Sequence, residues 1–123
     1  MKFTDEDRVA LYKKAQSYID AESHSDFRNE VVHALDERAD EDLYDRFYTS
    51  LAFGTAGMRG VIGGGTNRMN VFMVRKVTQG LADYITESTV KGPVVIAYDS
   101  RLYSDVFAKE AALVLCANGI AVK

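Results

Sequence analysis

A glycine-dense stretch over residues 53–70 constrains the fold of this chain more than any other feature. It begins with FGTAGMRG at residues 53–60 and continues through Gly63, Gly64 and Gly65. Glycine allows a positive φ and lets a ligand approach closely, because no Cβ stands in the way. The stretch is therefore expected to be a loop, and an arginine held in such a loop suits recognition of phosphate or carboxylate.

Two interpretations of this loop remain open from residue types alone. It is either an anion-binding loop or a tight turn with Arg59 as a solvated surface residue. No Gly-Lys-Ser/Thr follows at the Walker A spacing, and the pattern is not a Gly-x-Gly-x-x-Gly dinucleotide fingerprint. Arg68 either reaches the same site or covers the start of the helix that follows Asn70.

The charge distribution favours a small anionic ligand. Residues 1–53 contain 13 acidic and 7 basic side chains, whereas residues 54–123 contain 5 acidic and 8 basic ones. The positive half holds the glycine loop. Because nucleic-acid binding usually requires a strongly basic patch, no nucleic-acid partner is expected.

The chain has 123 residues, 47% of them hydrophobic and 27% charged, which is typical of one soluble globular domain. Cys116 is the only cysteine, so a disulfide framework is excluded and a reducing compartment is favoured. No apolar run approaches the roughly 20 residues that a membrane span needs. We expect a cytoplasmic protein without a membrane partner, and we expect Cys116 to lie in the core.

Apolar residues at helical spacing predict three short helices before the glycine stretch. Thr4 or Asp5 is expected to cap the first, Ser25 or Asp26 the second, and Asp40 the third. We interpret these helices as structural.

A longer helix is predicted after the glycine stretch, from an N-cap at Asn70 to about Thr86. Gly80 inside it is expected to mark close packing on a neighbouring element.

The last thirty residues predict a βαβ unit with a right-handed crossover. Residues 94–98 form an apolar run typical of a buried strand. A helix beginning at Ser104 or Asp105 and ending at Asn118-Gly119 follows, and residues 120–123 open a second strand. The fold class is therefore α/β.

Asp99 and Arg101 directly follow the first of these strands, at the edge where open α/β sheets bind ligands. Asp99 and Arg101 are expected to contact a ligand or to form a local ion pair that shapes the turn. The two roles are compatible. His24 and His33 lie nine residues apart on predicted surface helices, and no compact acidic cluster is present, so no metal site is expected in this chain.

Residues 53–60, followed by NRMN at 67–70, closely resemble the start of the α-D-phosphohexomutases, the phosphoglucomutase/phosphomannomutase family. Residues 95–101 (VIAYDSR) resemble that family's next block. The resemblance implies a three-layer α/β/α sandwich around a mixed sheet, the first of four domains. Residues 1–52 would be a helical lead-in, and residues 53–123 an incomplete first domain.

The resemblance also implies a function. Such enzymes move phosphate between the 1- and 6-positions of a hexose, through a bisphosphorylated sugar and an enzyme phosphoserine, with Mg²⁺ and hexose 1,6-bisphosphate as cofactors. Arg59 would be the active-site arginine, and Thr55 and Gly57 would shape its loop. Asp99 and Arg101 would lie beside the cleft, and the partners would be a phosphosugar and the remaining domains.

The catalytic serine and the metal-binding motif of such an enzyme are expected beyond Lys123. We therefore expect an N-terminal fragment that is inactive alone, binds no cofactor, and self-associates through an uncovered sheet edge. Two alternatives remain: a free-standing anion-binding or regulatory module derived from the same domain, and a small nucleotide-binding α/β domain.

Overall fold

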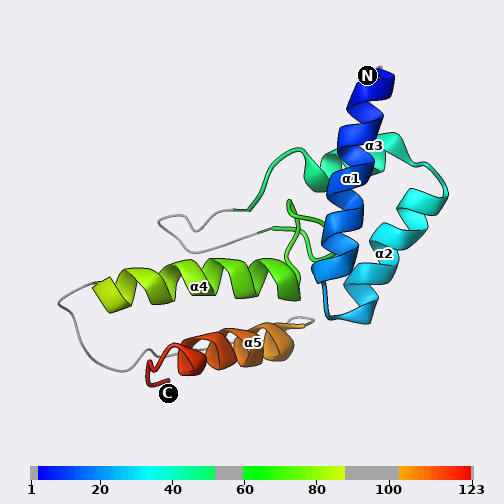
Figure 1. Ribbon diagram of the computed structural model, residues 1–123. Coiled ribbons are helices and arrows are strands. Elements are labelled where there is room, and N and C mark those ends of the chain that lie inside the picture. The colour runs from blue at the N-terminus through cyan, green and yellow to red at the C-terminus, as the bar shows by residue number, and fades with distance from the viewer. Residues whose placement is uncertain (1–2, 52–59, 88–102, 123) are drawn as a thin grey trace. The chain divides into compact units, whose positions relative to one another are not determined.

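The structure, a computed structural model, describes residues 3–51, 60–87 and 103–122 (Figure 1). The chain divides into two compact units, residues 1–73 and residues 74–123, and each is described by itself. The described residues form these helices: α1 (Asp5–Ala21), α2 (Ser25–Asp36), α3 (Asp40–Phe47), α4 (Val71–Glu87) and α5 (Ser104–Ala117).

The first unit is built on the three N-terminal helices, as the sequence predicts. α1 packs against both α2 and α3, which also contact each other (Figure 1). Apolar side chains from all three helices form one core, against which Phe72 also packs. The buried members of this core are Leu11, Ala15, Tyr18, Val31, Ala34, Leu43 and Phe47.

The N-cap of α1 is confirmed, but those predicted for α2 and α3 are wrong. Thr4 forms a capping box with Asp7 at the start of α1. α2 is capped by His24, whose Nδ1 accepts from the Asp26 backbone N–H at 3.3 Å. Ala39 precedes α3 and makes no side-chain cap.

Asp40 is the first residue of α3 and does not cap it, because its carboxylate binds α1 instead. The carboxylate accepts hydrogen bonds from the Tyr12 hydroxyl and from Arg8 Nε, the latter at 2.9 Å. These two bonds, with the Arg8 charge, hold the pKa of Asp40 below its usual value. Asp40 thus ties α1 to α3.

In the second unit, α4 and α5 are joined by apolar and polar contacts. Ala82, Leu115 and Ile120 form a small buried cluster. Arg75 Nε donates to Glu110 Oε2 at 2.7 Å, and the side-chain amides of Gln79 and Asn118 bond each other. α5 begins at Ser104 and ends at Ala117, and the predicted Asn118-Gly119 pair follows, with Asn118 as C-cap and Gly119 at φ +75°.

Two predictions for the second unit are wrong. A Cβ added to Gly80 would meet no atom within 4 Å, so this glycine marks no close packing against the described residues. The Cys116 side chain is exposed, because α5 buries Phe107 and Leu115 on its other face.

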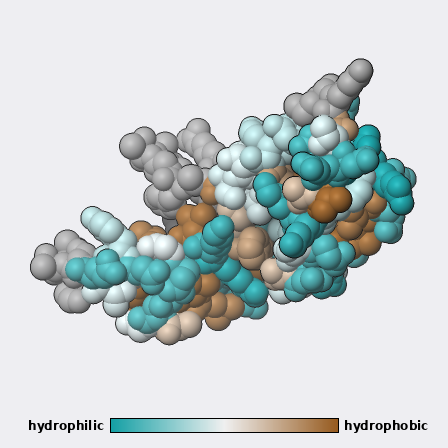
Figure 2. Space-filling view, turned by 45° about the horizontal axis from the view of Figure 1, so that its top comes forward, coloured by the Kyte–Doolittle hydropathy of each residue, from teal (hydrophilic) through white to brown (hydrophobic). Residues whose placement is uncertain are grey.

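The mixed sheet stays a prediction. Within the described ranges Ile62 and Met69 form an isolated parallel bridge, and Val122, in the predicted second strand, also takes part in a β-bridge. The predicted strand at residues 94–98 lies outside those ranges. None of the described helices is long and apolar enough to cross a membrane. On the face shown in Figure 2, hydrophilic side chains surround several apolar patches.

Candidate functional site

The structure describes the second half of the glycine stretch, residues 60–70. Thr55, Gly57 and Arg59 precede this half, and they lie outside the described residues, as do Asp99 and Arg101. Their predicted contacts with a phosphosugar therefore stay predictions. What the structure reveals is how the remaining part of the loop is fixed in place.

Backbone hydrogen bonds and Asn70 close residues 61–70 into a compact loop. The Met69 N–H donates to the Val61 carbonyl at 2.8 Å, and the Gly63 N–H donates to the Met69 carbonyl at 3.0 Å. Asn70 is fully buried, and its Nδ2 donates to the carbonyls of Gly63 (2.9 Å) and Gly65 (2.7 Å).

Asn70 also caps α4, as predicted, because its Oδ1 accepts from the Met73 N–H at 2.9 Å. One amide therefore closes the loop and starts the helix. The first of these two roles was not foreseen from the sequence.

Arg46 on α3 and Glu30 on α2 bind the loop backbone together. Arg46 Nη1 donates to the Gly64 carbonyl at 3.0 Å and to Glu30 Oε1 at 2.8 Å, and its Nε donates to Asp42 at 3.0 Å. Glu30 Oε1 also accepts from the Gly64 N–H at 3.3 Å. Burial alone would lower the pKa of Arg46, but its bonds to Glu30 and Asp42 outweigh burial and raise it.

Two glycines of the loop, Gly64 and Gly65, lie so close to neighbouring helices that a side chain would not fit there. A Cβ on Gly64 would lie 2.3 Å from the Phe27 carbonyl oxygen and 2.6 Å from Val31 Cγ2. Gly65 has φ +121°, and a Cβ there would lie 2.7 Å from the Arg46 carbonyl oxygen. The loop backbone therefore lies directly on α2 and α3, which no larger residue would permit.

A buried carboxyl group joins α1 to the loop and to α4. Glu22 is 2% exposed; its Oε1 accepts from the Tyr18 hydroxyl at 3.0 Å, and its Oε2 accepts from the Phe72 N–H at 3.0 Å. The Gly65 backbone also acts on the Tyr18 hydroxyl and partly offsets the rise in its pKa. Burial raises the pKa of Glu22 and of Tyr18, although the bonds that Glu22 accepts oppose its shift.

Arg68 is held on α3. Its guanidinium donates to the Asp45 carbonyl oxygen at 3.3 Å and pairs with the Asp45 carboxylate. The Arg68 side chain is 12% exposed, whereas that of Asp45 is 64% exposed. Arg68 thus anchors the loop to α3, and its proposed contact with substrate stays a prediction.

Among the described residues no group of three or more His, Cys, Asp or Glu side chains could hold a metal ion. His33 lies 3.2 Å from Glu37 on the same helix, and His24 serves as the cap of α2.

Comparison with known proteins identifies the family. Residues 50–123 match the family described as phosphoglucomutase/phosphomannomutase, alpha/beta/alpha domain I. The chain is 42% identical over 90 residues to a phosphoglucomutase of Staphylococcus saprophyticus, covering 73% of this chain and 16% of that protein. It is 39% identical over 104 residues to a phosphoglucomutase of Staphylococcus epidermidis. That match covers 77% of this chain and 19% of the other protein. No solved structure matches.

The matched region begins just before the glycine stretch and continues to the end of the chain, so the loop described above opens an α/β/α domain. The chain belongs to the phosphoglucomutase/phosphomannomutase family. It spans less than a fifth of the length of the curated relatives named above, at 16% and 19%.

Proposed function

We propose that this chain is the N-terminal part of a phosphohexomutase, which moves phosphate between the 1- and 6-positions of a hexose. The reaction would pass through a bisphosphorylated sugar and a phosphoserine on the enzyme. The observation that carries the proposal is the family match over residues 50–123, which contains the whole FGTAGMRG segment. The identity of 39–42% to phosphoglucomutases supports it.

In this proposal Arg59 contacts the transferring phosphoryl group, and Thr55 and Gly57 shape its loop. Asp99 and Arg101 lie beside the same cleft. Phosphoryl transfer depends on positioning and on neutralising charge, which a fixed guanidinium supplies. The helices α1 to α3 would contribute by holding the loop backbone that continues from Gly60.

The proposed domain arrangement is a helical lead-in over residues 1–52 and a partial α/β/α domain with a mixed sheet over residues 53–123. As the family resemblance implies, the Mg²⁺ of the whole enzyme would be held by an acidic motif in another domain. Hexose 1,6-bisphosphate would likewise act in the whole enzyme. The lone cysteine supports a cytoplasmic location.

The test is Arg59→Ala in the complete protein. We expect kcat/KM for a hexose 1-phosphate to fall by about 100-fold or more, as when a transition-state donor is removed. Arg75→Ala is the matched control, because Arg75 pairs with Glu110 on the surface of α4 and α5 and is expected to leave activity unchanged. Full activity of the Arg59 variant would contradict the assignment.

The 123-residue chain alone is expected to show no mutase activity in a coupled assay, because the nucleophile and the metal site would lie elsewhere in the enzyme. Turnover by the purified chain would contradict this part of the proposal.

A further inference from the structure

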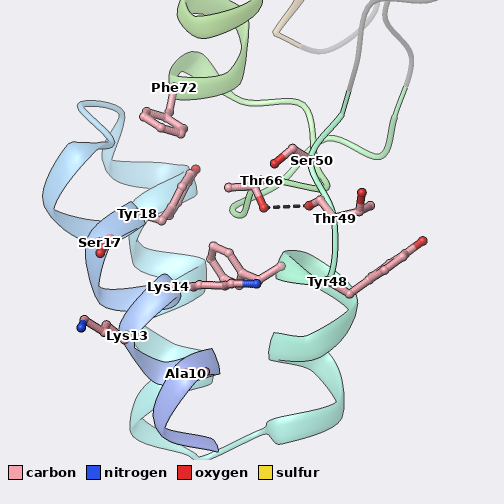
Figure 3. Close-up of a pocket in the computed structure, with 11 residues that line it drawn as sticks. Ala10, Lys13, Lys14, Ser17, Tyr18, Tyr48, Thr49, Ser50, Thr66 and Phe72 are labelled. Carbon is pink, nitrogen blue, oxygen red and sulfur yellow. Dashed lines mark hydrogen bonds between the residues drawn. The ribbon is translucent and has the colours of Figure 1, made fainter. Parts of the chain in front are cut away.

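The first unit contains a pocket that the proposed reaction does not use. It has a volume of about 580 Å³ and lies between α1 and the segment that follows α3 (Figure 3). The aromatic rings of Tyr18, Phe47 and Phe72 line it, with hydroxyl groups at its edge. Ligand sites for small molecules have volumes of about 300–1,000 Å³ and similarly apolar walls.

The walls of this pocket are fixed by contacts within the protein. The Tyr18 ring meets the rings of Phe47 and Phe72 edge-on, with both centroid distances at 5.7 Å. The Tyr18 hydroxyl is held by buried Glu22, and Thr66 Oγ1 donates to the Thr49 carbonyl at 2.8 Å (Figure 3). The pocket is therefore formed without a ligand, which lowers the cost of ordering on binding.

Lys14 supplies a positive charge at this pocket. Figure 3 shows its side chain running from α1 toward Tyr48, whereas that of Lys13, which also lines the pocket, points away from Tyr48. Lys14 forms no ion pair with any described residue, although residues 1–53 carry 13 acidic side chains. An unpaired ammonium beside apolar walls attracts an anion more strongly than one in open water does.

A second pocket, of about 370 Å³, adjoins the first. The two share Ala10, Lys14, Phe47 and Tyr48, so Lys14 lines both of them. An anionic head group held by Lys14 would leave the apolar body of the same ligand against Tyr18 and Phe72.

We propose that this pocket binds an aromatic anion: a flat apolar ring system that carries one carboxylate or phosphate group. The rings of Tyr18, Phe47 and Phe72 recognise the body, and Lys14 recognises the charge. Both head groups present the same chemistry to a lysine, which acts as a point charge. This inference does not depend on the mutase activity.

The test is a titration of the ¹⁵N-labelled 123-residue chain with 2-naphthoate and with 1-naphthyl phosphate, followed by NMR. We expect saturable shifts of the backbone amides of Tyr18, Thr66 and Phe72 with at least one of these probes. The stronger binder identifies the head group. Two control ligands are expected to bind about tenfold more weakly or not at all. 2-Naphthalenemethanol has the aromatic ring system without the charge, and inorganic phosphate has the charge without the ring system.

Two variants of equal charge locate the site. Lys14→Glu is expected to weaken binding of the better probe by about tenfold or more, and Lys109→Glu, on α5 and not among the residues lining the pocket, by less than about twofold. Both positions are exposed on helices, Lys14 on α1 and Lys109 on α5, and glutamate is a good helix former, so both variants are expected to fold.

Equal effects of the two variants would overturn the proposal, because the attraction would then come from net charge alone. Absence of saturable shifts with both probes, or equal binding of the neutral alcohol, would overturn it as well.

Discussion

Glu22 shows how one buried side chain joins segments that are far apart in the sequence. A carboxyl group that is only 2% exposed is costly unless it is hydrogen-bonded. Glu22 accepts from Tyr18, four residues earlier, and from the Phe72 backbone, fifty residues later. The end of α1 is thereby connected to the start of α4.

Glu22 is expected to make stability depend on pH. Its pKa is raised in the folded state, so the folded chain binds more protons than the unfolded chain between the ordinary value of 4.5 and the raised value. The free energy of unfolding should therefore fall as pH rises through that window, with a slope of at most about 1.4 kcal/mol per pH unit from this group. In Glu22→Gln this contribution to the slope should disappear, as measured by urea unfolding at several pH values.

Glu41→Gln serves as the control for the loss of one carboxylate, because Glu41 is exposed in the first turn of α3. An identical slope in the wild-type chain and in Glu22→Gln would contradict the role assigned to burial.

Arg46 is expected to matter more for stability than an ordinary surface arginine. Arg46→Ala would leave the Glu30 carboxylate and the Gly64 carbonyl without their shared donor, at a cost of about 2–3 kcal/mol. Arg75→Ala removes a surface ion pair and should cost at most about 1 kcal/mol. Urea unfolding measures the free energy of unfolding of both variants. Equal losses of stability in Arg46→Ala and Arg75→Ala would refute the special role of Arg46.

At the scale of elements, the long helices were predictable and their caps were only partly so. Periodic apolar residues and Asn70 predicted α4 to within one residue of its end at Glu87. Asp40 was a reasonable cap for α3 by residue type, but Arg8 and Tyr12 on α1 bind its carboxylate. That competition is a tertiary contact, which local sequence does not contain.

The sequence predicted that the candidate site is a glycine-rich loop, but it did not predict which side chains hold that loop in place. The glycines and Arg59 marked a loop, and family resemblance gave it a proposed function. Nothing in the sequence indicated that Glu30 and Arg46, on two separate helices, would bind the same glycine. Gly64 was one available signal, since three glycines in a row imply close approach of a neighbour, but the identity of that neighbour depends on how the helices pack.

Two glycines should respond to alanine in opposite directions. Gly64→Ala is expected to destabilise the chain by about 2 kcal/mol or more, because the added Cβ meets the Phe27 carbonyl and Val31. Gly80→Ala is expected to stabilise it by up to about 1 kcal/mol, because alanine favours the helix and the Cβ meets no described atom. Thermal unfolding followed by circular dichroism compares the two. A destabilising Gly80→Ala would show that packing on Gly80 exists after all.

At the scale of the whole molecule, the first unit contains its own core and its own loop supports. Every contact from Glu22, Glu30 and Arg46 described above stays within residues 1–73. A polypeptide of residues 1–73 is therefore expected to fold alone, with helical circular dichroism and a cooperative urea transition. Glu22→Gln and Arg46→Ala should shift that transition as they do in the full chain. A non-cooperative, largely unfolded polypeptide would contradict this independence.

The attachment of the glycine loop to three helices also limits how it can be transplanted. A designer who copied only residues 53–70 into another scaffold would leave Arg46, Glu30 and Tyr18 behind, and the grafted segment would lose the hydrogen-bond partners of Gly64 and the close neighbours of Gly65. A working graft would have to carry α1 to α3 as well. The smallest segment that could be transplanted is thus the three helices together with the loop, and not the glycine-rich sequence motif alone.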